Sequence, residues 1–179
     1  MNSKSAVKKC TLVLGGAASG KSLFAEQLVK NTGKNRIYIA TSQIFDDEMR
    51  QKVEDHKKQR GDGWRTIEEP FDMAKALADA TPKDVVLIDC ATLWLTNHLL
   101  AEHDLGAEQE AFLNAIALCP SDVVIVSNET GLGIVPDNAL ARRFRNAQGR
   151  LNQAIASTAD TVVFVAAGLP MVLKGELPR

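Results

Sequence analysis

The chain has 179 residues, of which 45% are hydrophobic and 24% are charged, and its formal net charge is −1 at pH 7. This length suits one domain with a substantial core. A net charge so close to zero excludes a general electrostatic attraction to nucleic acid or to an anionic membrane surface, so we predict that the chain does not bind nucleic acid.

The chain begins with a polar, basic segment, residues 1–9, which we predict to be a disordered leader. The apolar stretch that follows has only the length of a strand, too short for the core of a signal peptide or for a membrane span. We therefore predict a cytoplasmic protein without a membrane span, with a single catalytic domain over residues 10–179. Cys10, Cys90 and Cys119 are far apart and odd in number, which predicts buried thiols rather than disulfides or a metal site.

A phosphate-binding pattern follows the first predicted strand, residues 11–14, and opens a helix predicted over residues 22–30. The pattern is G-x-x-x-x-G-K-S, and its residues are Gly15, Gly16, Ala17, Ala18, Ser19, Gly20, Lys21 and Ser22. Glycines let successive backbone N–H groups turn toward phosphate oxygens at a helix N-terminus. Lys21 is predicted to contact the β- and γ-phosphates, and Ser22 to ligate Mg²⁺. A merely structural turn would not need Lys-Ser after its last glycine, so the pattern predicts a nucleoside triphosphate site.

Strand and helix patterns alternate along the rest of the chain. Apolar runs predict buried parallel strands at residues 36–40, 85–88, 123–126 and 161–165. Mixed apolar and charged stretches predict amphipathic helices at residues 47–60, 71–79, 107–118 and 138–157. Residues 61–64 are predicted to form a loop. The alternation predicts an α/β fold with a mainly parallel sheet flanked by helices.

The predicted strand 85–88 ends in Asp89, as a Walker B strand does when it places a carboxylate for Mg²⁺ beside the phosphate-binding loop. An aspartate in this position is also common as a turn or helix cap. The phosphate-binding pattern earlier in the chain favours the metal-directed interpretation, so we predict that Asp89 and Ser22 hold the metal ion.

The three histidines carry little signal on their own. His56 lies in a charged run of a predicted helix, where a single histidine is usually solvated, although imidazole can act as a nucleophile or base near neutral pH. The sequence pattern leaves both interpretations open for His56. His98 and His103 have no supporting signal and are predicted to be solvated.

Several segments together make the chain resemble the bifunctional adenosylcobinamide kinase/adenosylcobinamide-phosphate guanylyltransferase family of cobalamin biosynthesis. The most specific segment is Asn128-Glu129-Thr130-Gly131-Leu132-Gly133-Ile134-Val135-Pro136, whereas the phosphate-binding loop is shared by many families. The resemblance also includes Ser127, directly before this segment, and residues 15–22, 38–43, 46–49, 56–57, 64–70, 87–90, 92–94, 140–145, 149–153 and 167–170. The resemblance therefore covers nearly the whole chain.

This resemblance implies a RecA-like P-loop NTPase fold, a homotrimer and two reactions that need Mg²⁺. ATP or GTP would phosphorylate the aminopropanol hydroxyl of adenosylcobinamide, and the adenosylcobinamide phosphate would then attack a guanylylated enzyme to give adenosylcobinamide-GDP. The family's histidine nucleophile corresponds to His56. A neutral imidazole is available for such an attack near neutral pH, and Lys21 would neutralise charge on the leaving pyrophosphate.

The resemblance also implies the residues that contact GTP. Besides residues 15–22 they are Ala40, Thr41, Ser42, Lys57, Lys58, Gln59, Arg60, Glu68 and Asp89. Residues 57–60 match the family in basic character more than in identity, and a solvated helix end is their alternative interpretation. The family often has arginine at the position of Ala18, but backbone N–H groups do most of the phosphate binding, so this difference should not abolish it.

Some features leave alternatives open. Arg142, Arg143, Arg145 and Arg150 could contact phosphate or corrinoid, form a subunit interface, or lie on a solvated face. Two other functions are compatible with the phosphate-binding loop: a P-loop small-molecule kinase or NTPase that leaves His56 unused, and a nucleotide-dependent switch with a partner protein.

Overall fold

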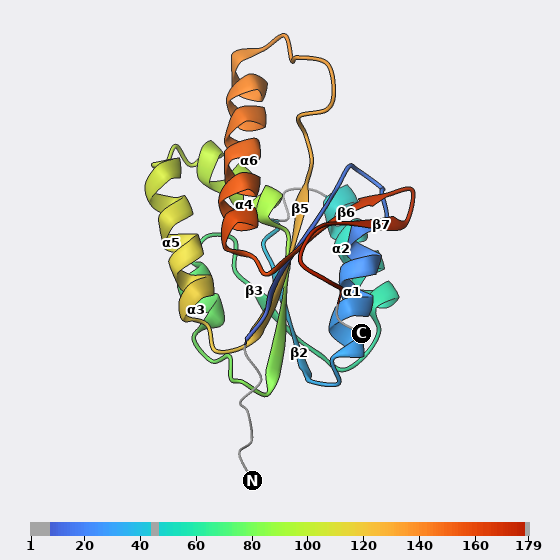
Figure 1. Ribbon diagram of the computed structural model, residues 1–179. Coiled ribbons are helices and arrows are strands. Elements are labelled where there is room, and N and C mark those ends of the chain that lie inside the picture. The colour runs from blue at the N-terminus through green and yellow to red at the C-terminus, as the bar shows by residue number, and fades with distance from the viewer. Residues whose placement is uncertain (1–7, 44–46, 178–179) are drawn as a thin grey trace.

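The computed structural model describes residues 8–43 and 47–177, and in this part of the chain a single seven-stranded sheet lies between two layers of helices (Figure 1). Helices α1 (Lys21–Asn31) and α2 (Asp47–Arg60) cover one face of the sheet. Helices α3 (Met73–Leu77), α4 (Ala91–Leu100), α5 (Leu105–Leu118) and α6 (Ala139–Thr158) cover the other.

The strands are β1 (Cys10–Gly15), β2 (Asn35–Ala40), β3 (Trp64–Glu68), β4 (Asp84–Asp89), β5 (Asp122–Asn128), β6 (Thr161–Ala166) and β7 (Leu169–Lys174). Their order across the sheet is β3-β2-β4-β5-β1-β6-β7. Within the described ranges every neighbouring pair is parallel except β6 and β7, which are antiparallel. The carboxyl ends of six strands therefore meet at one edge, and the predicted α/β class with a mainly parallel sheet is confirmed.

The central strands are apolar on both faces because helices cover both. In β1, Leu12 packs into one core cluster with Trp94 and Phe112, whereas its neighbour Val13 packs into the other with Val29. Alternate residues of a strand point to opposite faces, so a strand buried between two helical layers needs an uninterrupted apolar run. This is why the central strands were recognisable in the sequence.

All the strands predicted from apolar runs are present. The helix predicted over residues 71–79 is shorter than expected, because Asp72 caps it by accepting a 2.9 Å hydrogen bond from the Lys75 N–H, and it ends at Leu77. The structure also contains β3, α4 and β7, which the patterns did not predict. The predicted loop, residues 61–64, ends where β3 begins at Trp64.

Three further predictions concern the leader, the cysteines and His98. The predicted leader, residues 1–9, lies mostly outside the described residues, but the N–H of Lys9 donates a 2.8 Å hydrogen bond to Asp122. All three cysteines are free and buried, as predicted, and burial raises the pKa of Cys90 to about 12. The prediction that His98 is solvated is wrong, because its side chain is buried beneath Trp94 and Phe71.

Among the helices of the described residues, none combines the length and apolar character needed to cross a bilayer.

Candidate functional site

The phosphate-binding loop lies between the end of β1 at Gly15 and the start of α1 at Lys21, at the edge where the parallel strands end (Figure 1). Gly20 occupies the N-cap position, no side chain caps the helix, and its first turn carries no acidic residue. The first N–H groups of a helix have no partner within the helix and favour an anion. The N-terminal end of α1 is therefore suited to binding phosphate.

Two glycines of the loop are required by their surroundings. A Cβ atom on Gly15 would lie 2.3 Å from Ser19 Oγ and 2.7 Å from the Val165 carbonyl oxygen. Gly20 has a φ of +91°, and a Cβ there would lie 3.1 Å from the Cα of Gly168. At Gly16, by contrast, a Cβ would meet no described atom within 4 Å. The spacing of the pattern thus has a steric cause at its first and last glycine.

Lys21 is already oriented across the loop. Its Nζ atom donates a 2.9 Å hydrogen bond to the carbonyl oxygen of Gly16, and the side chain is buried. This places the ammonium group over the loop whose N–H groups are predicted to hold phosphate. A phosphate oxygen arriving there could replace the carbonyl as acceptor and gain a charge-assisted hydrogen bond.

Asp89 ends β4 at the same edge. In the register of the sheet, Asp89 lies beside Val126 of β5, and the next strand beyond β5 is β1, which carries the loop. Tyr38 donates a 3.0 Å hydrogen bond to Asp89 Oδ2 from β2 on the other side. Burial raises the pKa of Tyr38, and the neighbouring Asp89 carboxylate raises it further, so the phenol keeps its proton and orients the carboxylate.

The Thr41 hydroxyl bonds with the backbone on both its donor and its acceptor side. Its hydroxyl donates a 2.7 Å hydrogen bond to the Cys90 carbonyl oxygen and accepts a 2.8 Å bond from the Cys90 N–H. Asn97 of α4 donates to the Thr41 carbonyl oxygen at 2.7 Å and to the Pro70 carbonyl oxygen at 3.0 Å. The predicted GTP contact at Thr41 stays a prediction, while the observed role of its hydroxyl is to fix the chain beside Asp89.

The ends of β2, β3 and β4 lie level with one another, since Ala40 pairs with both Glu68 and Asp89. The structure therefore brings Ala40, Glu68 and Asp89, three of the residues implied by the resemblance, to one place at the sheet edge. Ser42 follows Ala40 in the chain and is half-buried.

The basic side chains at the carboxyl end of α2 lie in different environments. The Lys57 ammonium lies 3.8 Å from Glu68 and 3.5 Å from Glu54, and Lys58 is exposed. Arg60 is instead buried, with its guanidinium carbon 3.4 Å from the centroid of the Tyr38 ring. In this structure Arg60 anchors the end of α2 on the sheet rather than facing solvent.

His56 lies within α2, and its side chain is outside the part of the chain that the structure describes, as is that of Gln59. The predicted role of His56 as nucleophile therefore stays a prediction. Its helix, however, is held at the carboxyl end by Arg60, which also lies 5.7 Å from the Trp64 ring. Tyr38 and Trp64 pack edge to face and form the two walls around the guanidinium group.

A buried polar network supports the loop from the other side, and reasoning from patterns missed it. Ser127 donates a 2.6 Å hydrogen bond to Asn152 Oδ1, and Gln148 donates to both residues at 2.9 Å. Asn128, at the end of β5, is held by Thr92 and Asn152, and the next N–H, of Glu129, donates to the Gly15 carbonyl oxygen at 3.0 Å. The only signal for these residues was that most of them fall in segments that resemble the family.

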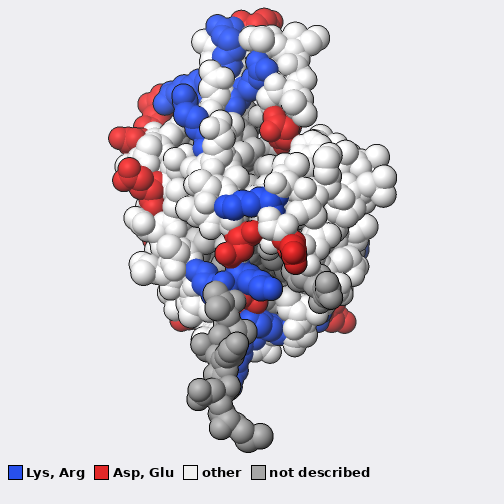
Figure 2. All heavy atoms as spheres, in the orientation of Figure 1, with Lys and Arg blue, Asp and Glu red and all other residues white. Residues whose placement is uncertain are grey.

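Two of the four arginines of α6, Arg142 and Arg145, hold the preceding loop. Arg145 donates a 2.6 Å hydrogen bond to the Gly131 carbonyl oxygen, and Arg142 donates to the carbonyl oxygens of Pro136 and Asp137. Figure 2 shows basic side chains gathered at the end of the molecule that α6 and this loop form. The same loop exposes apolar side chains, with Ile134 97% exposed. A backbone-holding role for Arg142 and Arg145 thus adds to the alternatives considered from the sequence.

Comparison with known proteins gives close relatives. The model of the family described as cobinamide kinase / cobinamide phosphate guanyltransferase matches residues 11–173. The chain is 47% identical over 168 residues to the bifunctional adenosylcobalamin biosynthesis protein CobP of Pseudomonas aeruginosa, with 92% of this chain and 97% of that protein covered. It is 40% identical over 179 residues to the bifunctional adenosylcobalamin biosynthesis protein CobU of Escherichia coli, with 91% and 98% covered.

Solved structures resemble the fold at much lower sequence identity. The protein PH0250 from Pyrococcus horikoshii superimposes with a TM-score of 0.54 at 10% identity, covering 93% of this chain and 86% of that chain. The RadB recombinase gives a TM-score of 0.47 at 16% identity, covering 87% and 73%. The likeness to PH0250 concerns the fold alone, whereas the sequence relatives cover almost the whole chain.

Proposed function

The chain belongs to the cobinamide kinase / cobinamide phosphate guanyltransferase family, and on this premise we propose that it phosphorylates adenosylcobinamide and then joins GMP to the product. The single observation that carries the proposal is the intact phosphate-binding loop with Asp89 at the same sheet edge, in a chain that matches its relatives nearly from end to end.

In the kinase step, the hydroxyl of the aminopropanol arm attacks the γ-phosphorus of ATP or GTP, and the nucleoside diphosphate leaves. The N–H groups at the start of α1 and the Lys21 ammonium bind the phosphates and neutralise the charge that develops. Lys21 needs little movement for this, because its ammonium already lies across the loop at Gly16.

We propose that Ser22 and Asp89 hold the Mg²⁺ ion that accompanies the nucleotide. A hydroxyl and a carboxylate offer the oxygen donors that this ion prefers, and the Tyr38 hydrogen bond orients the Asp89 carboxylate. The ion would supply charge neutralisation between the phosphates. Residues 15–22 and 40–42, Lys57, Lys58, Gln59, Arg60, Glu68 and Asp89 form the proposed nucleotide site.

In the guanylyl transfer step, a His56 ring nitrogen attacks the α-phosphorus of GTP, a nitrogen–phosphorus bond forms, and pyrophosphate leaves. A phosphate oxygen of adenosylcobinamide phosphate then attacks the same phosphorus, the nitrogen–phosphorus bond breaks, and its electron pair returns to His56. Two displacements of this kind suit one site, because the same loop neutralises the triphosphate in both reactions.

The proposal extends to the assembly and location of the enzyme. We propose a homotrimer in the cytoplasm, as the family resemblance implies. Two segments expose apolar side chains that contacts between subunits would bury. These side chains are Leu132 and Ile134 in the loop before α6, and Leu169, Met171 and Leu173 in β7.

The test is to incubate the protein with Mg²⁺ and GTP labelled at the α-phosphate, and to measure label bound to protein that is labile to acid and stable to alkali. Label is expected on the native protein and absent from the His56→Ala variant. A native protein that binds GTP without acquiring label would contradict guanylyl transfer and leave a P-loop kinase or a nucleotide switch.

A further inference from the structure

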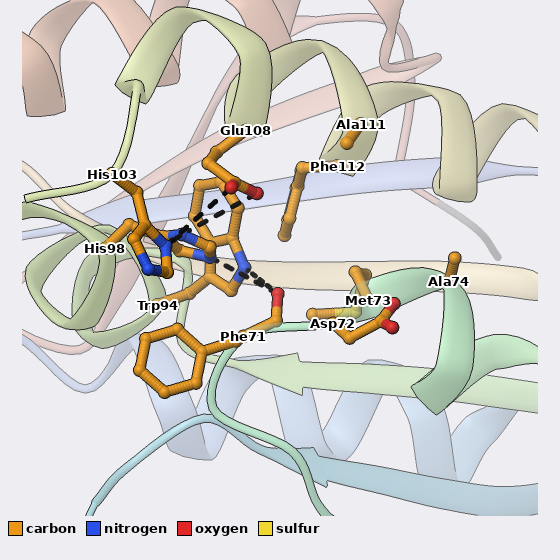
Figure 3. A pocket seen from close by; sticks show the side chains of 10 residues that line it. All are labelled: Phe71, Asp72, Met73, Ala74, Trp94, His98, His103, Glu108, Ala111 and Phe112. Carbon is orange, nitrogen blue, oxygen red and sulfur yellow. Dashed lines mark hydrogen bonds and ion pairs between the residues drawn. The ribbon is translucent and has the colours of Figure 1, made fainter. Parts of the chain in front are cut away.

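A cluster of three potential metal ligands lies apart from the nucleotide site, between α4 and α5. Figure 3 shows His98, His103 and Glu108 pointing toward one another beside a cavity of about 270 Å³. The cavity is also lined by Phe71, Trp94 and Phe112 among others. None of the described residues that line it belongs to the proposed nucleotide site.

The backbone brings the two histidines together. Helix α4 is followed, after its C-cap residue Ala101, by a left-handed residue, Glu102, with a φ of +58°. The His103 N–H donates a 3.1 Å hydrogen bond to the His98 carbonyl oxygen. This is the bond pattern of a Schellman motif, in which the residue after the left-handed one folds back over the last helical turn. Asp104 then caps α5, and its first turn carries Glu108.

The distances between the donor atoms suit a zinc ion. The Nδ1 atoms of His98 and His103 are 2.9 Å apart, and Glu108 oxygens lie 3.6 Å from His98 Nδ1 and 3.7 Å from His103 Nδ1. Zinc bonds of about 2.0–2.2 Å place neighbouring ligands of a tetrahedron about 3.3 Å apart. Shifts of a few tenths of an ångström would therefore bring all three ligands to one ion.

The orientation of His98 is fixed by its surroundings. Its Nε2 atom lies 3.3 Å from the Phe71 carbonyl oxygen, which can only accept a hydrogen bond. The proton is therefore assigned to Nε2, and the Nδ1 lone pair faces His103 and Glu108. The ring is 2% exposed and packs 4.5 Å from Trp94, measured between centroids. A backbone carbonyl behind the ligating ring is the usual support of a histidine ligand.

We propose that His98, His103 and Glu108 bind one zinc ion, with the fourth ligand position facing the cavity and open to water. Two imidazoles and a carboxylate favour zinc over Mg²⁺ or Ca²⁺, which prefer oxygen ligands throughout. The ion joins the end of α4 to the first turn of α5. Without the ion, the two histidines are joined only by a hydrogen bond between their Nδ1 atoms at the carboxyl end of α4.

The test uses the full chain, freed of metal by a chelator and without nucleotide, titrated with Zn²⁺ against a chromophoric chelator. One zinc ion per chain is expected at micromolar affinity or better, with a rise in melting temperature on binding. His103→Ala and Glu108→Gln should each weaken zinc binding by about ten-fold or more. Both side chains are partly exposed, so these variants should fold, which unfolding curves without zinc would verify.

Two controls locate the ion. Glu110→Gln removes an exposed carboxylate from the same helix and should leave zinc affinity unchanged. Asp89→Asn should also leave it unchanged, because Asp89 belongs to the proposed magnesium site and not to this cluster. Zinc binding that is weaker than millimolar, or that persists unchanged in the double variant of His103 and Glu108, would overturn the proposal. The readout is independent of enzymatic activity.

Discussion

The backbone N–H of Gly168 donates a 2.8 Å hydrogen bond to the carbonyl oxygen of Ser19, which joins the tip of the β6–β7 hairpin to the phosphate-binding loop. Ala167 and Gly168 form this two-residue tip with φ values of +51° and +76°, as tight antiparallel hairpins require. The antiparallel strand at the edge of the sheet therefore supports the nucleotide loop through a contact between residues far apart in the sequence.

Replacing Gly20 with alanine should disturb this contact directly. The new Cβ would lie 3.1 Å from the Cα of Gly168, and a φ of +91° is unfavourable for alanine. We expect the free energy of unfolding to fall by about 1–2 kcal/mol and the dissociation constant of ATP to rise about ten-fold or more, a loss of about 1.4 kcal/mol. Thermal unfolding and calorimetric titration measure the two effects.

Gly168→Ala is the matched control for this variant. A Cβ at Gly168 would meet no atom within 4 Å in the part of the chain that the structure describes, although the φ of Gly168 is also positive. It should lower stability by a similar amount while changing ATP affinity less than Gly20→Ala does. Equal losses of ATP affinity in the two variants would contradict the steric explanation.

Tyr38→Phe should reveal how the Asp89 carboxylate is oriented. The variant keeps the ring that packs against Arg60 and removes only the hydroxyl that donates to Asp89 Oδ2. Because groups that orient a metal ligand typically contribute ten-fold or more to metal affinity, the Mg²⁺ concentration for half-maximal kinase activity should rise about ten-fold. A Mg²⁺ titration at saturating ATP measures this, and an unchanged midpoint would speak against Asp89 as a metal ligand.

Arg60→Ala should affect the helix that carries His56. The guanidinium group is buried on the Tyr38 ring, and a desolvated cation–π contact of this kind contributes about 2 kcal/mol. We expect lower stability and a slower formation of the labelled protein from GTP than in the native chain. Lys58→Ala, which removes an exposed charge from the same helix, is the control and should leave stability within about 0.5 kcal/mol.

If Arg60→Ala lowered stability but left the rate of labelling unchanged, the end of α2 would not position the nucleophile. If both variants slowed labelling equally, loss of positive charge rather than loss of the aromatic contact would be the cause.

Asp84 gives a prediction for acid stability. The Thr81 hydroxyl and N–H donate to Asp84 Oδ2 at 2.6 and 2.8 Å, and these bonds, with one from Asn35, hold the pKa of the buried carboxyl below its ordinary value. A lowered pKa in the folded state means that the contribution to stability is present above the unfolded pKa of about 4 and is lost as the pH falls through the folded pKa.

Thr81→Val removes the hydroxyl from this arrangement. The free energy of unfolding at pH 7 should fall by about 1–2 kcal/mol, and the difference from the native chain should shrink as the pH falls below 4. Urea unfolding at a series of pH values measures this. A difference that stayed constant from pH 7 to pH 3 would mean that Asp84 does not carry the effect.

The elements that pattern reasoning missed share a physical cause. Helix α4 has the sequence ATLWLTNHLL and is buried on almost every side, so it has no polar face to give a helical period. Strand β3 is mostly exposed and polar, and β7 is exposed throughout and contains Pro170. These edge strands form because they pair with β2 and β6, and the sequence of one short strand does not indicate its pairing partner.

The sequence by itself determined the phosphate-binding loop, the central strands and the family, because each rests on residues that are contiguous or on segments matched one by one. Only the tertiary structure decided which distant residues meet. Tyr38 and Asp89 are 51 residues apart and belong to neighbouring strands, and Ser19 reaches Gly168 only through the order of β1 and β6 in the sheet. The burial of His98 against Phe71 likewise depends on how α4 packs, which no local pattern of the chain expresses.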